Sequence, residues 1–317
     1  MQPTPTASTA PSAAQSEPGP RAADSAVPPT TTPVPRWRYK WSIALYRGAS
    51  PLALAPIDPR GRPALTAKDV TDVPALCVAD PFLLQRPDTL YLFFEVMNRA
   101  TDRGELAYAT SDDGLAWRYG GVVLREPFHL SYPQVFEWQG RLLMVPETRQ
   151  AKAIRLYEAD AFPHRWRHVA TLCEGPYADA TLHWDGRRWW MFAQRGLDEL
   201  RLFHAPAPEG PWTEHRDSPL WPGNRRRTRP GGRMLVHDGR LLRFAQDGWP
   251  SYGSFLRVFV VDRLDVDGYE EHEAAESPIL GASRSGWNAL AMHHIDAMPT
   301  AAGDWLAVVD GATLALG

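Results

Sequence analysis

Four carboxyl groups stand at positions where they could act on one ligand. Asp80 and Asp179 each follow a small residue and open a short apolar segment, whereas Glu147 and Asp247 each close one. Carboxylates that face one another raise the pKa of one member, which then becomes a proton donor near neutral pH. We therefore predict a site of acid–base chemistry, provided that the fold brings these side chains together.

Two arginines add a second kind of chemistry. Arg229 and Arg233 flank Pro230-Gly231-Gly232, a stretch with almost no side-chain bulk. Guanidinium groups bind carboxylates and phosphates through two parallel hydrogen bonds, so a pair of them predicts a fork for an anionic ligand. The alternative is a structural network in which they pair with Asp80, Asp179 or Glu147. The residues alone leave both interpretations open.

Further polar groups lie in the last third of the chain and in its second repeat. We predict substrate contacts from Tyr132, His293, His294 and Asp296. The two histidines with Asp296 make a conceivable metal set, but no partner stands at a metal-binding spacing, and packed, hydrogen-bonded histidines are the favoured interpretation. The sequence therefore predicts neither a metal nor a cofactor.

The elements that must position these groups are five short apolar segments that repeat along the chain. Each begins with a polar residue, and these anchors are spaced 52, 47, 50 and 65 residues apart: Asp80, Tyr132, Asp179, Arg229 and His294. Most copies are followed by a Gln-Gly or Asp-Gly turn and a second apolar strand, which is the pattern of a β-hairpin. Repeats of roughly 40 to 50 residues with several strands each indicate a β-propeller. We predict an all-β fold, a five-bladed β-propeller whose inner strands line a central channel.

The two ends of the chain predict how the ring closes. Residues 1–36 are rich in Pro, Ala, Ser and Thr and are predicted to be disordered, which leaves residues 37–317 for the propeller. After Val309 too few residues remain to complete the fifth blade. We expect residues 41–54 to supply its outer strands, because this removes a sheet edge and ties the ends of the propeller together.

The predicted architecture resembles the clan of five-bladed glycosidases that includes arabinanases, β-xylosidases, invertases and levansucrases. The resemblance implies that Asp80 is the base or nucleophile and that Asp179 supports it. The clan's general acid, a glutamate at the start of the fourth inner strand, is replaced here by Arg229 and the residues that follow it. A guanidinium cannot donate a proton near neutral pH, so Glu147 is the candidate substitute acid.

Five motifs resemble another family more closely: Ala79-Asp80-Pro81-Phe82-Leu83, His129-Leu130-Ser131-Tyr132-Pro133, Pro146-Glu147-Thr148, Arg229-Pro230-Gly231-Gly232-Arg233 and Met292-His293-His294-Ile295-Asp296. They are similar to the N-terminal propeller domain of glucosamine inositolphosphorylceramide transferases, which also occurs in bacterial proteins. In the plant members a separate glycosyltransferase domain follows. We expect the present chain to be a stand-alone propeller.

Composition narrows the range of partners and locations. A net charge of -3 over 317 residues argues against general nucleic-acid binding, which needs a basic face. No segment approaches the ~18 apolar residues of a membrane span. The two cysteines, Cys77 and Cys173, make no disulfide framework and predict buried thiols in a reducing compartment. With no secretory signal visible, we expect a cytoplasmic protein.

Two classes of function remain open at this stage. The first is an enzyme that hydrolyses or transfers glycosidic bonds, with Asp80 and Asp179 at its centre. The second is a non-catalytic module that binds a glycan or sugar phosphate and assists a glycosyltransferase in polysaccharide or glycolipid assembly. The missing fourth-blade glutamate favours the second class, and the retained aspartates favour the first.

Overall fold

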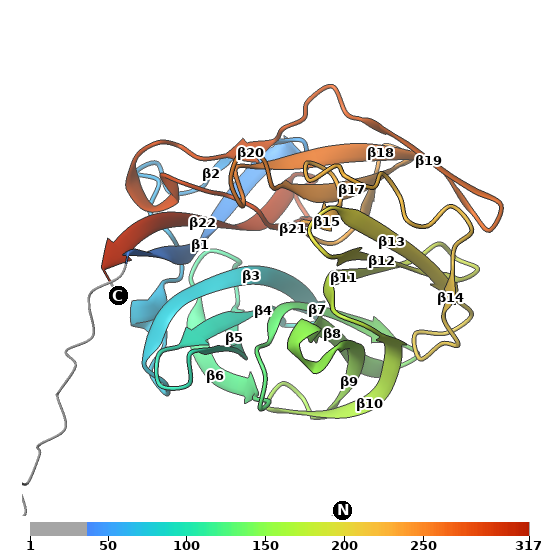
Figure 1. Ribbon diagram of the computed structural model, residues 1–317. Helices are drawn as coiled ribbons and strands as arrows, with labels where there is room; N and C mark the ends of the chain where they lie inside the picture. Colours follow the sequence, from blue (N-terminus) through green and yellow to red (C-terminus); the bar gives the residue numbers. More distant parts are fainter. Residues whose placement is uncertain (1–36, 317) are drawn as a thin grey trace, which may run out of the picture. The chain divides into compact units, whose positions relative to one another are not determined.

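The computed structural model of the protein describes residues 37–316, and the predicted disordered segment 1–36 lies outside the described residues. The described part of the chain forms five antiparallel sheets around a common axis, which confirms the predicted all-β, five-bladed β-propeller (Figure 1). No helix of this part is long and apolar enough to cross a membrane.

The first four blades follow one another along the chain, each built outward from the axis. The first contains β3 (Ala75–Arg86), β4 (Thr89–Asn98), β5 (Arg103–Ser111) and β6 (Arg118–Leu124). The second contains β7 (Ser131–Trp138), β8 (Arg141–Glu147), β9 (Ala153–Ala161) and β10 (Arg165–Glu174). The third contains β11 (Tyr177–Trp184), β12 (Trp189–Arg195), β13 (Glu199–Ala205) and β14 (Thr213–Glu214).

The fourth blade is less regular at its inner edge. Its strands are β15 (Arg229–Pro230), β16 (Leu235–His237), β17 (Arg240–Asp247), β18 (Phe255–Asp265), β19 (Gly268–Glu273) and β20 (Leu280–Gly281). Both β15 and β16 pair with β17, so the inner strand is interrupted between them. Three short 3-10 helices connect other elements: η1 (Ala67–Asp69), η2 (Arg149–Ala151) and η3 (Gly286–Asn288).

The fifth blade joins the two ends of the described chain. It contains β21 (Ile295–Pro299), β22 (Trp305–Leu316), β1 (Trp37–Ser50) and β2 (Ala53–Pro56). β1 pairs with β22 continuously from Trp37↔Leu316 to Gly48↔Trp305, and β2 pairs with β1 on the outside. The predicted ring closure by residues 41–54 is therefore confirmed.

The core is a ring of five apolar interfaces, one between each pair of neighbouring blades. β1 shows how one strand serves two of them, because its side chains alternate between the two faces of the sheet. Ile43 and Leu45 pack towards the first blade, whereas Ala44 and Tyr46 pack towards the fourth. Each blade is apolar on both faces for this reason, and each inner strand starts at the same end of the channel.

The closure predicts how the protein responds to truncation. Deletion of residues 1–35 should leave the free energy of unfolding unchanged, since it spares β1. Deletion of residues 1–56 removes β1 and β2, and with them the buried side chains of two interfaces. Loss of even one large buried side chain costs about 2 to 5 kcal/mol, so the longer truncation should be insoluble or unfold far more easily. Chemical denaturation of both proteins is the measurement, and equal stabilities would contradict the closure.

Candidate functional site

Three inner strands begin with the same local distortion. Strand pairing skips two residues in β3, β7 and β11, and the first skipped residue has a left-handed backbone: Asp80 (φ 51°), Tyr132 (φ 50°) and Asp179 (φ 50°). Such a β-bulge changes the direction of a side chain, and a left-handed residue other than glycine costs roughly 1–2 kcal/mol. The fold thus holds these three polar side chains against a local preference, which is typical of functional sites.

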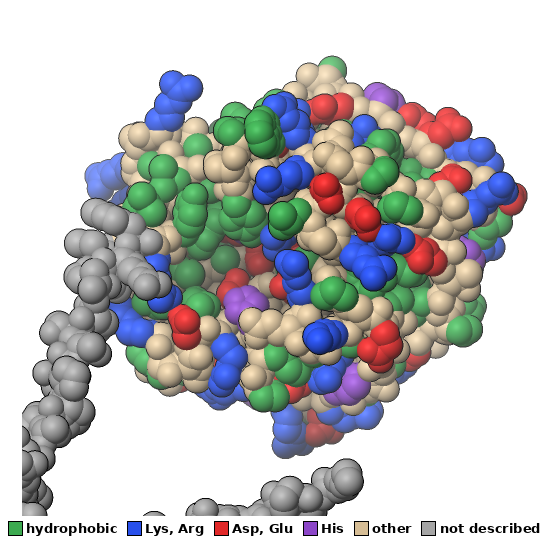
Figure 2. Space-filling view, in the orientation of Figure 1, with side chains coloured by type: hydrophobic (Ala, Val, Ile, Leu, Met, Phe, Trp, Pro, Cys, Tyr) green, Lys and Arg blue, Asp and Glu red, His purple; other side chains and the backbone are tan. Residues whose placement is uncertain are grey.

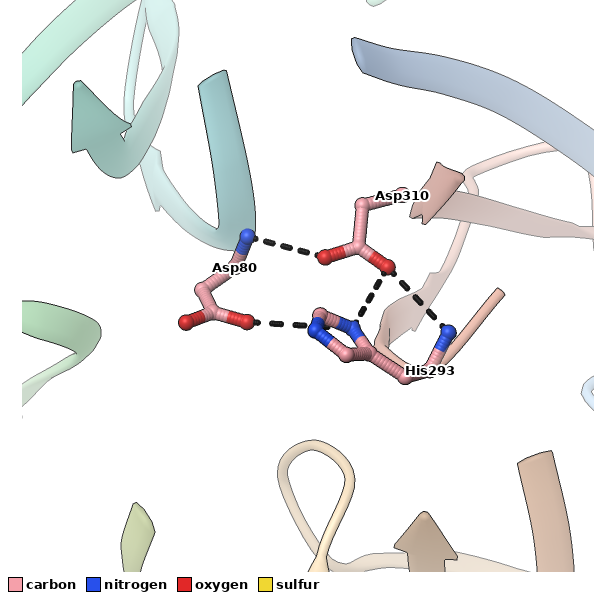
Figure 3. A group of neighbouring side chains, drawn as sticks. All are labelled: Asp80, His293 and Asp310. Atoms are coloured by element: carbon pink, nitrogen blue, oxygen red, sulfur yellow. Dashed lines mark hydrogen bonds and ion pairs between the residues drawn. The ribbon is translucent and has the colours of Figure 1, made fainter. Parts of the chain in front are cut away.

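A fully buried carboxylate on β22 holds the first of these bulges in place (Figure 3). Oδ2 of Asp310 accepts a hydrogen bond from the backbone N–H of Asp80 at 3.1 Å. Its Oδ1 accepts bonds from the backbone N–H groups of His293 and His294 at 3.3 and 3.1 Å, and lies 2.9 Å from Nδ1 of His293. Burial by itself would raise the pKa of Asp310, but the neighbouring His293 keeps this pKa below its ordinary value. Asp310 therefore links the first blade to the last.

The side chain of Asp80 lies against two histidines. Its Oδ1 is 4.0 Å from Nδ1 of His293 and 3.9 Å from Nδ1 of His294, and it has no hydrogen-bond partner among residues 37–316. Burial, aided by the Asp310 carboxylate, raises the pKa of Asp80 well above its ordinary value. Nε2 of His294 donates to the carbonyl oxygen of Pro81, 2.9 Å away, and burial lowers the pKa of His294 to about 4.

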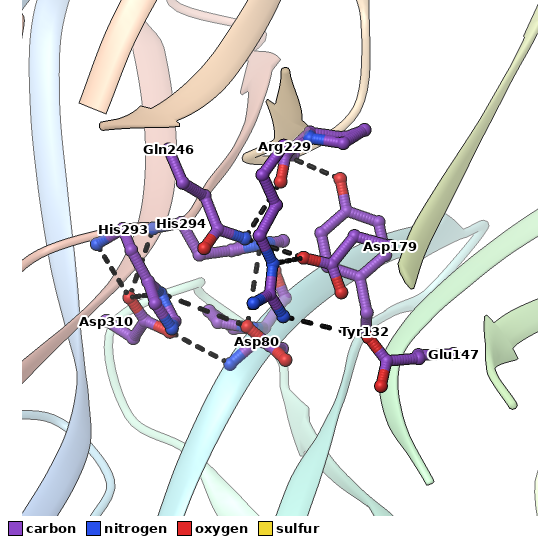
Figure 4. A network of polar contacts seen from close by, with 12 residues as sticks. Asp80, Tyr132, Glu147, Asp179, Arg229, Gln246, His293, His294 and Asp310 are labelled. Carbon is purple, nitrogen blue, oxygen red and sulfur yellow. Dashed lines mark hydrogen bonds and ion pairs between the residues drawn. The ribbon is translucent and has the colours of Figure 1, made fainter. Parts of the chain in front are cut away.

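Asp179 lies on the other side of the channel and is neutralised by an arginine (Figure 4). Nε of Arg229 donates to its Oδ2 at 2.6 Å, and Nε2 of Gln246 donates to the same oxygen at 2.7 Å. Burial opposes ionisation here, but Arg229 holds the pKa of Asp179 below its ordinary value. The same guanidinium lies 3.7 Å from Oε2 of Glu147. Asp179 is only 1% exposed, so this ionised carboxylate lies behind the surface of the site.

Two glutamates near Asp179 have pKa values that are shifted upwards, in the direction opposite to that of Asp179. Burial and the charge of Asp179 raise the pKa of Glu147 to about 8. Burial and the charge of Glu147 raise that of Glu95 to about 8. The site therefore contains an ionised carboxylate beside carboxyl groups that keep a proton near neutral pH, which is the condition for both proton donation and hydrogen-bond donation.

These groups surround a cavity of about 530 Å³ at the channel end where the inner strands begin. Asp80, Glu95, Glu147 and His293 contribute to its polar part, and its aromatic wall includes Trp41. In Figure 2 this cavity is a hollow with acidic and histidine side chains at its bottom and hydrophobic side chains beside it. Its size suits a small-molecule ligand.

The predicted site residues divide into three groups in the structure. Asp80, Glu147, Arg229 and His293 line the cavity. Directly behind it are buried residues that hold the strand starts, namely Tyr132, Asp179 and His294. The remaining three, Arg233, Asp247 and Asp296, do not line the cavity.

The contacts of Arg233 contradict the predicted fork of two arginines for an anionic ligand. Its guanidinium pairs with Asp296 at 3.0 Å and donates to the carbonyl oxygens of Leu83 and Val135 at 3.2 and 3.0 Å. It thereby joins three inner strands further along the channel and lines a separate groove there. Arg229 pairs with Asp179 instead, so the two arginines do not form a joint anion clamp.

The glycines beside these arginines also have a structural reason. A Cβ on Gly232, whose φ is 144°, would lie 1.8 Å from the carbonyl oxygen of Ile295. The backbone N–H of Gly232 donates to the hydroxyl of Tyr132 at 2.7 Å. The small residues therefore admit the neighbouring inner strand β21 rather than a ligand, which we did not predict.

The interpretation of Asp247 as the fourth-blade equivalent of Glu147 is wrong by one residue. Glu147 pairs with Ser131, and the corresponding partner of Arg229 is Gln246. A shift of one residue in a strand moves a side chain to the opposite face. Asp247 accordingly points elsewhere and pairs with Arg257 at 2.8 Å.

Sequence reasoning missed Asp310 and Gln246 as site residues, although a signal for both exists. The second strand of every blade carries a carboxylic acid or an amide beside the start of the inner strand: Glu95, Glu147, Gln194, Gln246 and Asp310. In β22 the polar residue follows a run of apolar ones and belongs to the pattern only when all five blades are aligned.

One group of side chains has the composition of a metal site. Ligand atoms of Asp80, His293 and Asp310 lie within 4.8 Å of one another. Asp310 already accepts hydrogen bonds from three backbone N–H groups and from His293. These bonds satisfy Asp310 and His293 within the protein, whereas Oδ1 of Asp80 has no hydrogen-bond partner among the described residues.

Comparison with known proteins gives matches over nearly the whole described chain. The family model described as "Glucosamine inositolphosphorylceramide transferase 1, N-terminal" matches residues 38–312. Glucosamine inositolphosphorylceramide transferase 1 of Oryza sativa subsp. japonica is 36% identical over 305 residues, which cover 88% of this chain and 41% of the relative. Its counterpart in Arabidopsis thaliana is 34% identical over 297 residues, covering 86% and 39%. The chain thus spans about two fifths of the length of these curated relatives.

A solved structure confirms the architecture at much lower sequence similarity. The catalytic domain of the α-L-arabinofuranosidase of Coprinopsis cinerea has a TM-score of 0.56 and 12% identity, covering 88% of this chain and 99% of that chain. At this identity the likeness shows the fold alone.

The raised glutamate pKa values predict the pH dependence of stability. Unfolded, Glu95 and Glu147 titrate near 4.5, whereas in the fold their pKa values are about 8. Between these values the folded state binds more protons, so the free energy of unfolding falls as pH rises from about 4.5 to 8. We expect a Glu95→Gln/Glu147→Gln variant to lose much of this fall in urea denaturation. The exposed Glu174→Gln is the control, and an unchanged slope in the double variant would contradict the assignment.

Proposed function

We propose, because the chain belongs to the family of the glucosamine inositolphosphorylceramide transferase 1 N-terminal domain, that its propeller recognises a sugar or glycan in the funnel cavity. The relatives carry the name of an enzyme that handles glucosamine and inositolphosphorylceramide, both of which present sugar-like hydroxyl groups. Carbohydrate recognition is the function that this cavity supports best.

The observation that carries the proposal is a set of carboxyl oxygens left for a ligand. Asp80 and Glu147 line the cavity with side chains that are 10% and 11% exposed, and one oxygen of each, Oδ1 and Oε2, is buried without a hydrogen-bond partner among the described residues. The other oxygen of each carboxyl group is the one that a ligand hydroxyl can reach, and such a hydrogen bond contributes about 0.5–1.5 kcal/mol. Because the pKa values of both groups are raised, they can donate as well as accept, which matches the dual nature of a sugar hydroxyl.

Aromatic side chains support the same ligand class. The ring of Trp41 stacks on His293 with centroids 4.0 Å apart, and Tyr252 meets both rings edge-on at 6.1 and 5.1 Å. Trp41 and Tyr252 both line the cavity, and Tyr252, which is 37% exposed, offers a ring surface that suits the apolar face of a pyranose. An aromatic wall beside hydrogen-bonding carboxyls is a common arrangement for a ligand with both characters.

Cleavage or transfer of a glycosidic bond is the second candidate, and one observation favours it. Glu147, with a pKa of about 8, lies beside the ionised Asp179, as a general acid beside a second carboxylate would. However, Asp179 is held by Arg229 and is buried, and burial raises the pKa of Asp80. Neither is a ready nucleophile or base, so we place recognition before catalysis.

The partner in this proposal is a glycosyltransferase. The relatives are named as transferases and are more than twice as long as the matching region, so a sugar-recognising propeller can serve a transferase activity located in the rest of the protein or in another chain. Such a module would present a glycan or glycolipid acceptor during polysaccharide or glycolipid assembly. The two cysteines, both free thiols, favour a reducing compartment such as the cytoplasm for the present chain.

Sugar binding is tested first on Asp80. We expect Asp80→Ala to weaken binding of a sugar identified by glycan-array screening at least about tenfold, because it removes two hydrogen-bonding oxygens from the cavity. The exposed Asp88→Ala, in the turn at the far end of the same hairpin, should bind as the wild type does. Titration calorimetry is the measurement, and equal affinities of the two variants would contradict the proposed site.

Catalysis is tested separately with aryl glycosides. If the propeller only recognises sugars, wild-type protein should release no aryl alcohol above the rate of buffer alone. Turnover that Glu147→Gln and Asp179→Asn both abolish, with the fold retained by circular dichroism, would establish the second candidate instead.

A further inference from the structure

The edge of the cavity carries a group of basic side chains that the proposed sugar contacts do not use. Arg38 and Lys40 come from β1, Lys68 from η1, and Arg99 directly follows β4. All four line the same cavity as the carboxyl groups of Asp80, Glu95 and Glu147. Segments far apart in the sequence therefore place four cations around one opening.

Most of these cations have no internal partner. Arg38 forms an exposed ion pair with Asp102 at 2.9 Å, which contributes little binding energy and is easily replaced. No carboxylate within residues 37–316 forms an ion pair with Lys40, Lys68 or Arg99. Elsewhere in the propeller, arginines such as Arg201 and Arg257 each pair with two carboxylates. Three cations without an ion pair among the described residues thus stand at the mouth of one cavity.

We propose that Arg38, Lys40, Lys68 and Arg99 form an anion-binding subsite at the mouth of the cavity, and that the ligand is a sugar carrying a phosphate group. This inference rests on the proposed function and deepens it. The sugar lies against the carboxyl groups and Trp41, and the anionic group lies between the basic side chains. Lysines act as point charges towards phosphate, and Arg99 adds a guanidinium that can bind two oxygens at once.

The electrostatics of the cavity agree with such a ligand. Arg229, the cation at the bottom, is already neutralised by Asp179. Burial raises the pKa values of Glu95 and Glu147, so these groups repel an anion only weakly at neutral pH. The cations at the mouth then dominate the charge that an incoming ligand meets, although the whole chain is slightly acidic.

The anionic group has two chemical sources, a free sugar phosphate or the phosphate of a lipid headgroup. The four side chains act on the shared phosphate chemistry, and Arg38, Lys68 and Arg99 are exposed enough to reach either. The experiment therefore includes one arm for each source and one for the bare ion.

The test compares glucose with glucose 6-phosphate, inorganic phosphate, and phosphatidylcholine vesicles with and without phosphatidylinositol. Calorimetry serves for the soluble probes and sedimentation for the vesicles. We expect wild-type protein to bind glucose 6-phosphate at least about tenfold more tightly than glucose, with an advantage that shrinks as salt increases. Lys68→Ala/Arg99→Ala should remove most of that advantage. Arg187→Ala/Arg240→Ala, which removes two exposed arginines from the turns at the other end of the channel, should not.

The outcomes separate this subsite from the proposed sugar site. Equal affinity for glucose and glucose 6-phosphate would overturn the subsite and leave sugar recognition standing. Inorganic phosphate that binds wild type but not the Lys68/Arg99 variant, with no advantage from the sugar, would support the subsite and overturn the sugar site. Phosphate binding that both double variants retain equally, or no binding of any phosphate probe, would overturn the subsite. Preference for phosphatidylinositol vesicles over glucose 6-phosphate would identify the lipid source.

Discussion

A single buried carboxylate, that of Asp310, connects the closure of the ring to the geometry of the site. It accepts hydrogen bonds from the backbone of Asp80 in the first blade and of His293 and His294 at the start of the last inner strand. A carboxylate in an apolar interior is stable only when such donors compensate its desolvation. The hydrogen bond that holds the bulge at Asp80 thus forms only when the last blade meets the first.

Burial also determines which carboxyl groups around the cavity have raised pKa values. Carboxyl groups removed from water keep their protons unless a cation compensates them. Arg229 compensates Asp179, and His293 compensates Asp310, whereas Asp80, Glu95 and Glu147 have raised pKa values. The site therefore combines compensated charges behind its surface with protonated carboxyls at it. That distribution suits hydrogen bonding to hydroxyl groups better than nucleophilic attack.

The inner strands differ from one another in ways that follow from their crowding at the axis. Three of them carry a left-handed residue in a bulge, and the fourth has glycines where the neighbouring strand β21 comes within contact of its backbone. Arg233 joins three inner strands through Asp296 and two carbonyl oxygens. Arg233 and Asp296, which the sequence suggests as ligand contacts, instead hold these strands together.

The sequence alone determined the five repeats, the all-β propeller, the closing strands from residues 41–54 and the family, because hairpins and repeats are local patterns that survive without knowledge of distant contacts. It also placed Asp80 and Glu147 at the funnel, since strand starts and ends are readable from the repeat. Only the tertiary structure decided which partner each charge takes. The pairing of β15 with β17 places Gln246, and not Asp247, opposite Arg229, and the partners of Arg229, Arg233 and Asp310 come from strands up to 230 residues away. Lys68 and Arg99 line one cavity for a similar reason, because η1, β1 and β4 are separate along the chain and meet only in the folded propeller.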